Sequence, residues 1–173
     1  MYKQIKIGSV EPGPDSVLSQ SSTQQRQLVS GLSIHGAWQL VSYGVEVKSN
    51  GLMFNPMGEK PNGYVIFTPE GRVSFTLTAE NRQAPESVQD RADLFNSMIA
   101  YTGTYRLSGN QWVTRVDAAW NPQWVGTEQT RYFLIEGDKL VVQTPWRVMP
   151  NWPEKGLTRS IVCFQRCQGG FRS

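Results

Sequence analysis

The sequence holds a single histidine and only two cysteines, with no cluster of His, Cys and carboxylate residues at metal-ligand spacing. A zinc site needs such ligands, so no metal site is predicted. Cys163 and Cys167 lie in and just after a strand-like run, which puts their Cα atoms about 13 Å apart at ~3.3 Å per residue. A disulfide permits only about 7 Å. Free thiols are typical of a reducing compartment.

Long apolar runs and clustered charges are also missing. No stretch approaches the roughly 20 apolar residues of a membrane span, and the N-terminus lacks the apolar core of a signal peptide. The net charge is +3, but lysines and arginines are dispersed rather than gathered into the basic stripe that nucleic-acid binding requires. We therefore expect a cytoplasmic protein with no membrane and no nucleic-acid partner.

Two catalytic motifs are absent. There is no Gly-x-Ser-x-Gly nucleophile elbow, which argues against covalent hydrolysis. No glycine-rich loop links a strand to a helix, which argues against a nucleotide, so no cofactor is predicted. His35 precedes the first strand in a short loop, where a lone histidine is typically a surface or capping residue.

The first residues carry turn formers and a polar run at 19–27 instead of periodicity. Such a composition buries too little apolar surface to offset the entropy of ordering, so we expect a flexible arm at 1–31 and one domain at 32–173. The alternative is an arm that wraps the domain or a second subunit, which leaves a homodimer open. Its apolar anchors would be Ile5, Ile7, Val17, Leu18, Leu28 and Val29.

After residue 32, strand-forming runs alternate with short turns. One segment, 86–100, instead repeats apolar residues at helical spacing. A meander of eight antiparallel strands removes its edges by closing into a barrel that can hold one small ligand. The predicted fold is all-β: an eight-stranded antiparallel barrel with one helix between the third and fourth strands. The predicted strands are 37–48, 63–68, 72–79, 101–107, 111–119, 127–135, 140–143 and 159–166, and the helical repeat is Val88, Ala92, Phe95 and Ile99.

The hairpin at 127–143 poses the main question. Side chains alternate with period two, so Gln129 and Arg131 share a face with Phe133 and Ile135. Either Arg131 is solvated, or an arginine and an amide face an otherwise apolar interior.

Five motifs occur in order along the chain: Gly36–Ser42, Pro61–Ser74, Tyr101–Tyr105, Pro122–Gly126 and Gln129–Arg131. Together they resemble the bacterial and fungal lipocalin-like domain family, over roughly residues 34 to 166. The resemblance implies a compact eight-stranded barrel with a central cavity, and some related lipocalin-like proteins are similar to cofactor-independent isomerases or cyclases. This chain departs from the pattern at Thr114 and Arg115, where many relatives carry a histidine, so no mechanism through that histidine is expected.

Two pairs of polar residues are candidates for catalysis. Inside a barrel, Arg131 and Gln129 could stabilise an enolate, carboxylate or phenolate; alternatively, Arg131 neutralises a buried carboxylate. Arg115 and Asp117 share a face of one strand, where Asp117 could act as a general base beside Arg115. On the outer face they would be an ordinary solvated pair.

Aromatic residues supply the other candidates. Tyr64 and Tyr101 could donate a phenol proton to a carbonyl, and the tryptophans near strand ends could roof the barrel. The alternatives are core aromatics with locally satisfied hydroxyls, and indoles that plug one end. The predicted ligand-binding residues are Tyr43, Ser74, Tyr105, Trp120, Trp124, Phe133 and Trp146.

Three functions follow from these features. The first is a cofactor-independent isomerase or cyclase for a hydrophobic, oxygenated small molecule of natural-product type. The second is a non-catalytic carrier of such a ligand, which needs only an apolar lumen and a few orienting polar groups. The third is an assembly module that uses the arm and the outer face of the barrel.

Overall fold

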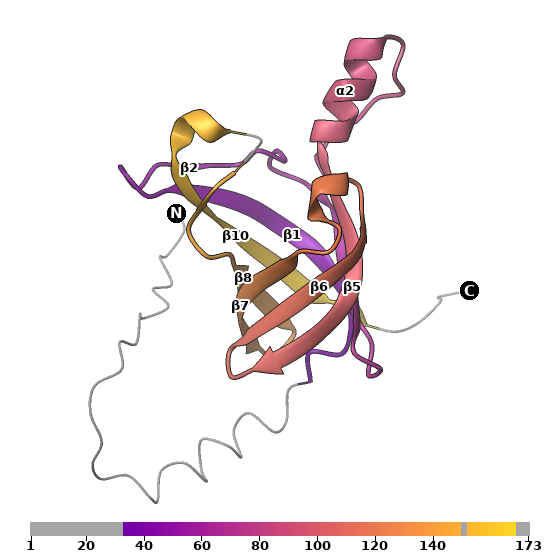
Figure 1. Ribbon diagram of the computed structural model, residues 1–173, viewed down its shortest axis with the longest axis vertical. Helices are drawn as coiled ribbons and strands as arrows, with labels where there is room; N and C mark the ends of the chain where they lie inside the picture. Colours follow the sequence, from indigo (N-terminus) through magenta and orange to yellow (C-terminus); the bar gives the residue numbers. More distant parts are fainter. Residues whose placement is uncertain (1–32, 150–151, 169–173) are drawn as a thin grey trace, which may run out of the picture. The chain divides into compact units, whose positions relative to one another are not determined.

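The computed structural model describes residues 33–149 and 152–168, and the predicted arm at 1–31 lies outside them. Eight strands follow the order β1-β3-β4-β5-β6-β7-β8-β10, every neighbouring pair is antiparallel, and β1 pairs with β10 to close the barrel (Figure 1). The predicted fold is confirmed. The strands are Gly36–Val47, Asn62–Phe67, Arg72–Thr78, Met98–Ser108, Gln111–Ala119, Glu128–Glu136, Lys139–Gln143 and Leu157–Arg166.

Two further strands extend this barrel at one end. The two-residue strand β2, Met53–Phe54, pairs with β1, and the two-residue strand β9, Arg147–Val148, pairs with β10. They lie near the end where β4, β6 and β8 finish, which we call the mouth. The opposite end carries the β3–β4, β5–β6 and β7–β8 turns, and we call it the hairpin end.

The β7–β8 turn shows why the sequence pattern is a reliable guide at the hairpin end. Glu136 pairs with Lys139, so the loop consists of Gly137 and Asp138. Gly137 has a φ of +58°, a conformation that costs glycine little and other residues more.

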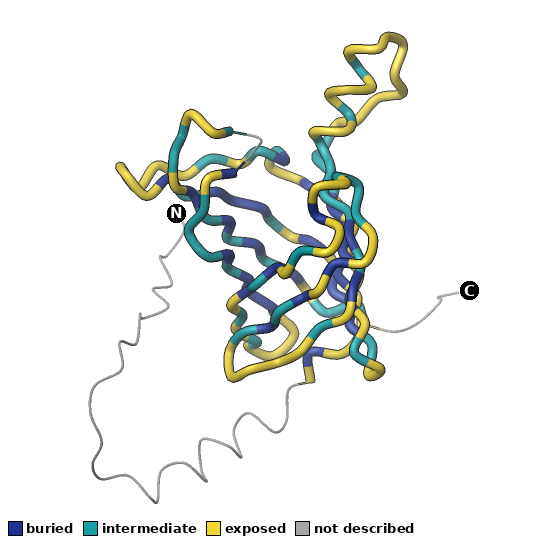
Figure 2. The backbone as a smooth tube through the Cα atoms, in the orientation of Figure 1, coloured by how far each residue is buried: buried dark blue, intermediate teal, exposed yellow. Residues whose placement is uncertain are grey.

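The hairpin end is filled by aromatic and aliphatic side chains. Trp38, Trp112 and Phe67 are fully buried there, and the Phe67 ring lies 5.1 Å from that of Trp112. Burial alternates along most strands, as the tube coloured by exposure shows (Figure 2). The apolar set belongs to one continuous core that also includes Leu40, Val65, Val73, Phe75, Leu140 and Phe164.

A bulge in β1 changes which side chains of that strand face inward. Its pairing with β10 shifts register between Leu40 and Ser42. Trp38 and Leu40 are buried before the bulge, and Tyr43 and Val45 are buried after it, so the inward positions move from even to odd numbers. An extra residue in one strand has this effect because side chains alternate with period two. Tyr43 therefore points into the barrel.

The helix is shorter than predicted and lies outside the core. α2 spans Val88–Asn96 between β4 and β5, and none of its residues is buried; Val88 is 79% exposed (Figures 1 and 2). A capping box between Ser87 and Asp90 starts the helix, and its end at Ser97 precedes the pairing of Met98 with Thr78 on β4. The predicted extension to residue 100 is wrong, because sheet pairing takes over at Met98. Ile99 belongs to β5.

Within the two described ranges, no helix combines the length and apolar character that crossing a membrane requires.

Candidate functional site

Arg131 and Gln129 both point into the barrel. Arg131 is 6% exposed, and its guanidinium donates 2.8 Å from Nη1 to the Thr130 carbonyl oxygen. Both of its terminal nitrogens also lie 3.5 Å from Oε1 of Gln129. No described carboxylate pairs with Arg131. Of the sequence alternatives, solvation is excluded by burial, and pairing with a carboxylate is found nowhere in the described part of the chain.

A second arginine joins this pair. Arg147 donates from Nη1 to the same Oε1 of Gln129 at 2.9 Å. Burial, and after it the positive charge of Arg131, lower the pKa of Arg147 to about 10. One neutral amide oxygen thus accepts from two guanidinium groups, and it offsets little of their charge.

Tyr101 completes what we call the arginine cluster: Gln129, Arg131, Arg147 and Tyr101. Tyr101 is 4% exposed, and its hydroxyl proton has no acceptor, while Arg131 lies beside the hydroxyl oxygen. Burial raises the pKa of Tyr101, while the two arginines act in the opposite direction. The phenol is therefore a protonated donor at neutral pH.

Trp124 covers the arginine cluster from the mouth side. It lies in the short 3-10 helix η1, Pro122–Trp124, which Asn121 caps through its side chain. Its ring is 5.4 Å from that of Tyr101, and the guanidinium carbon of Arg147 lies 5.4 Å from its centroid. Such a contact over an indole face stabilises a cation without neutralising it.

Other polar groups face the same layer of the barrel. The Tyr43 hydroxyl lies 2.8 Å from Oγ of Ser160 on β10, and both residues are buried. Thr114 pairs in register with Gln129, and its buried hydroxyl has no partner. The Nε of Arg147 is also buried without a partner. Buried polar groups normally have a hydrogen-bond partner. Several buried polar atoms without partners close together are therefore more typical of a binding or catalytic site than of a structural core.

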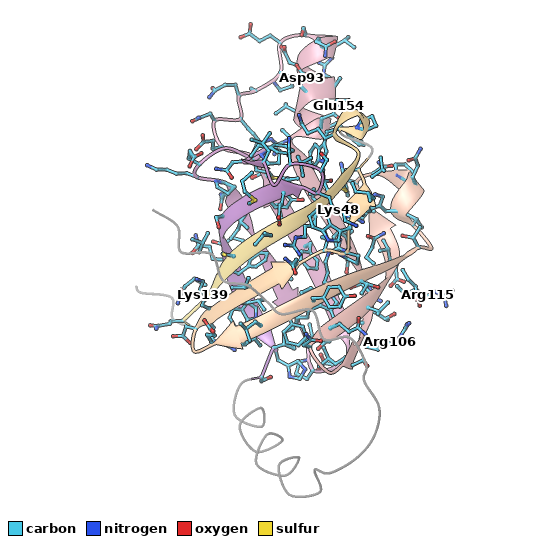
Figure 3. All side chains as sticks on the ribbon, turned by 90° about the vertical axis from the view of Figure 1, so that its left-hand side faces the viewer. Lys48, Asp93, Arg106, Arg115, Lys139 and Glu154 are labelled. Carbon is cyan, nitrogen blue, oxygen red and sulfur yellow. The ribbon has the colours of Figure 1, made fainter. Side chains whose placement is uncertain are left out.

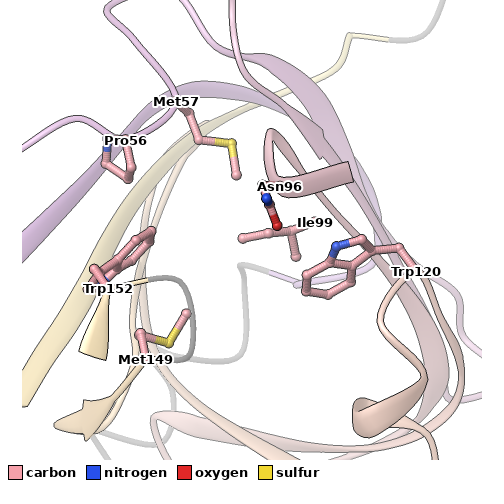
Figure 4. Close-up of a pocket in the computed structure, with 7 residues that line it drawn as sticks. All are labelled: Pro56, Met57, Asn96, Ile99, Trp120, Met149 and Trp152. Atoms are coloured by element: carbon pink, nitrogen blue, oxygen red, sulfur yellow. The ribbon is translucent and has the colours of Figure 1, made fainter. Parts of the chain in front are cut away.

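A small pocket opens at the mouth. Its space measures about 40 Å³, enough for a few water molecules. Trp120 and Trp152 stand on opposite sides of it, with Met149 between them (Figure 4). The remaining lining residues are Pro56, Met57, Asn96 and Ile99.

The residues that line the pocket adjoin those around the arginine cluster. Ile99 precedes Tyr101 by one inward position on β5, and Trp120 packs against Trp124 at 4.9 Å between ring centroids. On the other side, Trp152 donates from Nε1 to the Thr158 hydroxyl at 3.2 Å. That hydroxyl lies 3.4 Å from the carbonyl oxygen of Arg147. Trp120 and Trp152, which line the pocket, therefore contact residues that in turn contact Arg147: Trp124 and Thr158.

Four predicted site residues lie on the outer face of the barrel. Tyr64 is 42% exposed and Ser74 is exposed, because the buried positions of β3 and β4 are the odd-numbered ones. Arg115 extends outward from the wall (Figure 3). Asp117 forms its ion pair with Arg72 instead of Arg115. The prediction that these four side chains face the interior of the barrel is wrong. The alternative, an exposed ion pair on the outer face, is correct for Asp117, but its partner is Arg72 and not Arg115.

Three predicted aromatic residues lie away from the arginine cluster. The ring of Trp146 has Arg159 at 4.5 Å and Lys48 at 5.8 Å over it; Arg159 is paired with Glu46 in the wall of β1 and β10. Phe133 packs on Trp112, and Tyr105 donates to the Thr68 carbonyl oxygen. Phe133 and Tyr105 therefore belong to the hairpin end, as the core-aromatic alternative predicts.

The sequence interpretation missed Arg147. Its strand has two residues, too few for any periodicity, and its position follows only from the pairing of Arg147 with Thr158. Ser160 was also missed, although β10 carries a signal: its buried positions run Thr158, Ser160, Val162 and Phe164, from polar to apolar.

One comparison with known proteins bears on this barrel. A family model described as lipocalin-like domain matches residues 35–167. An uncharacterized protein from Bacteroides eggerthii, known from a crystal structure, is similar over 78% of this chain and 100% of its own, with 12% identity and a TM-score of 0.38. So weak a likeness carries no argument about this chain. No curated protein was found to match it.

Proposed function

Because this chain belongs to the lipocalin-like domain family, whose barrels are suited to small-molecule binding, we propose that it binds a hydrophobic, oxygenated small molecule inside the barrel. The oxygen would meet Arg131, Gln129 and Tyr101, and the apolar body would extend toward the mouth. The observation that carries this proposal is Arg131, buried in the interior with only neutral oxygens as partners.

The arrangement of polar and apolar surfaces supports this orientation. Binding sites for small molecules are mostly apolar, with few polar groups that fix the ligand. The mouth supplies the apolar surface through Ile99, Trp120 and Trp152, and the arginine cluster supplies the donors. A buried arginine that served stability alone would be expected to pair with a carboxylate.

The ligand must displace side chains to enter. The pocket of about 40 Å³ is smaller than the roughly 300–1,000 Å³ of typical ligand pockets. Met149 and Met57 line it, and methionine side chains adapt readily to new shapes. We therefore expect the mouth side chains to rearrange when a ligand binds.

The test compares two arginines on neighbouring strands. Titration calorimetry with cinnamamide, a neutral aromatic molecule with one carbonyl oxygen, should detect binding to the natural protein. Arg131→Leu should stay folded and weaken binding by about tenfold or more, because a hydrogen bond from a charged donor contributes ~1.5 to 3 kcal/mol. Arg115→Leu, on the outer face, should bind as the natural protein does. A folded Arg131→Leu with unchanged affinity contradicts the proposal.

A cofactor-independent isomerase or cyclase is the second candidate, and the Tyr101 hydroxyl favours it. A protonated, unpartnered phenol beside two guanidinium groups can donate to a carbonyl oxygen and stabilise an enolate. Within the described residues, no carboxylate lies in the arginine cluster to remove a proton from carbon, so binding is the better supported function.

Turnover is tested with metabolites from a strain that lacks the gene. Incubation with the purified protein should convert one compound into an isomer of equal mass with a different chromatographic retention. Tyr101→Phe should abolish the conversion and retain binding. A bound compound that is returned unchanged contradicts catalysis and favours the carrier.

A further inference from the structure

The interior of the barrel has an excess of hydrogen-bond donors and positive charge. Arg131 and Arg147 converge on Oε1 of Gln129, with Arg147 at 2.9 Å and both terminal nitrogens of Arg131 at 3.5 Å. The Tyr101 hydroxyl and the Nε of Arg147 are buried donors without partners. Against these donors stand two neutral oxygens: Oε1 of Gln129, and the Thr130 carbonyl oxygen, which accepts from Arg131 at 2.8 Å.

Two like charges are costly here, with Arg131 buried and Arg147 half-buried. Each guanidinium loses hydration on burial, and the two repel one another, which is why the pKa of Arg147 is depressed to about 10. No acidic side chain of the described residues pairs with either arginine. By contrast, Arg72, Arg106 and Arg159 in the outer wall each pair with a carboxylate. These three outer arginines have carboxylate counter-charges, whereas no described carboxylate pairs with the inner two.

We infer that the ligand carries an anionic head group of the carboxylate class, held between Arg131 and Arg147, with an apolar body that points to the mouth. This inference rests on the proposed function and specifies its ligand. A carboxylate offers two acceptor oxygens, and the planar fork of a guanidinium matches it in two parallel hydrogen bonds. The Tyr101 hydroxyl provides a further donor to the same group.

The body of the ligand follows from what surrounds the arginines. Trp124 lies against both Tyr101 and Arg147, at 5.4 Å in each case, and Trp120 continues this aromatic surface to the pocket. A free inorganic anion would leave that apolar surface unused. An aromatic or polycyclic carboxylate would use both parts of the site.

The test is a matched pair of probes that differ in charge alone. Cinnamate and cinnamamide have the same aromatic body, but only cinnamate is an anion at neutral pH. Titration calorimetry at low salt should show that the natural protein binds cinnamate at least about tenfold more tightly, the difference expected between charge-assisted and neutral hydrogen bonds. Inorganic phosphate should not displace cinnamate. Equal affinities for the two probes, or displacement by phosphate at equal concentration, would overturn the inference.

The matched variants replace two arginines that each lie over a tryptophan ring: Arg147 over Trp124 inside the barrel, and Arg159 over Trp146 on the outer wall. Arg147→Met should remove the preference for cinnamate and leave the affinity for cinnamamide within about threefold. Arg159→Met removes the outer arginine over Trp146 and should preserve the preference. Arg147→Lys keeps the charge and should retain part of the preference. Arg131→Met serves as a second interior variant in case Arg147→Met does not fold. A preference that survives in both folded interior variants would refute the inference.

Different results would contradict the proposed small-molecule binding and the proposed anionic head group. If cinnamamide binds as tightly as cinnamate and Arg131→Leu abolishes both, the barrel is a small-molecule site without an anionic ligand. If neither probe binds, the proposed function fails together with the anionic head group.

Discussion

Along two strands, β7 and β10, the two halves of this barrel have opposite interiors. Toward the hairpin end, the inward positions of β7 are Phe133 and Ile135, and those of β10 are Val162 and Phe164. Toward the mouth, the same strands present polar inward positions: Gln129, Arg131, Thr158 and Ser160. Each strand therefore supplies core at one end and site at the other.

This difference separates stability from function within one fold. The hairpin end buries large side chains in close contact, which is where folding free energy comes from. The mouth half holds two arginines and three of the four unsatisfied buried side-chain atoms of the described residues, which oppose folding; the fourth, Nε1 of Trp112, lies toward the hairpin end. Proteins retain such unfavourable groups mainly where a ligand or a reaction uses them. Substitutions in the two halves should therefore have opposite effects.

The largest expected effect is at the hairpin end. Phe67 is 1% exposed, and its ring packs edge-on against those of Tyr105 and Trp112 at 5.2 and 5.1 Å. Phe67→Ala should lower the free energy of unfolding by about 3 to 5 kcal/mol, measured by urea denaturation. Ile66→Ala, at the adjacent outward position, should change it by less than about 1 kcal/mol. Equal losses would mean that the hairpin end is not the core.

An opposite effect is expected at the mouth half. Arg147→Met should raise the free energy of unfolding near neutral pH by about 1 to 3 kcal/mol, as replacement of buried charges by apolar residues often does. Burial, and after it the charge of Arg131, lower the pKa of Arg147 to about 10 in the folded chain, so above this pH the unfolded chain binds more protons at Arg147. The unfavourable contribution of Arg147 to the free energy of unfolding therefore diminishes as the pH rises through 10. The advantage of Arg147→Met should shrink over the same range.

This prediction is checked by urea denaturation of both proteins from neutral pH to above pH 10. The difference between the two proteins is the relevant quantity, because lysines remote from Arg147 titrate equally in both. The Tyr101 hydroxyl is the exception, since burial raises its pKa and the charge of Arg147 acts in the opposite direction. A variant that is less stable at neutral pH would show that Arg147 supports the fold, and the contrast between the two halves would weaken.

A smaller effect is expected where the two halves meet. Tyr43→Phe removes the hydrogen bond to Ser160 and leaves the buried Ser160 hydroxyl with one partner fewer. A loss of about 1 kcal/mol in the free energy of unfolding is expected by thermal denaturation. Tyr132→Phe, on the outer face of β7, should cost nothing measurable. A larger loss at Tyr132 would contradict the assignment of Tyr43 to the interior.

The fold could be predicted from sequence because strand alternation is local. The β6 bounds, Gln111–Ala119, agree with the prediction, and the others differ by a few residues. The predicted helix was too long because Val88 and Phe95 fit an amphipathic pattern. In the structure neither side chain packs into the core, and both are exposed. The cytoplasmic location and the homodimer stay predictions.

The site was predictable only in part. Gln129 and Arg131 follow from alternation on a long strand, whereas Arg147 depends on a long-range pairing that no local pattern contains. Ser74 and Tyr64 show the reverse error: residue type favoured the interior, but strand register turned both outward. Register is set by neighbouring strands and bulges, and therefore by the whole sheet.

The smallest expected effect concerns Asp117, a candidate general base from its sequence position. It pairs with Arg72 on the outer wall, where the two side chains are 43% and 44% exposed. Exposed ion pairs contribute little because water and salt screen them, so Asp117→Asn should change the free energy of unfolding by less than about 1 kcal/mol and less still at high salt. Affinity for cinnamate and any isomerisation should be unchanged, since the carboxylate lies on the opposite side of the wall from the arginine cluster. Calorimetry and urea denaturation on this one variant decide whether outer residues take part. A lost activity in a stable Asp117→Asn would mean that the site extends through the wall, and that the mouth half alone does not hold the function.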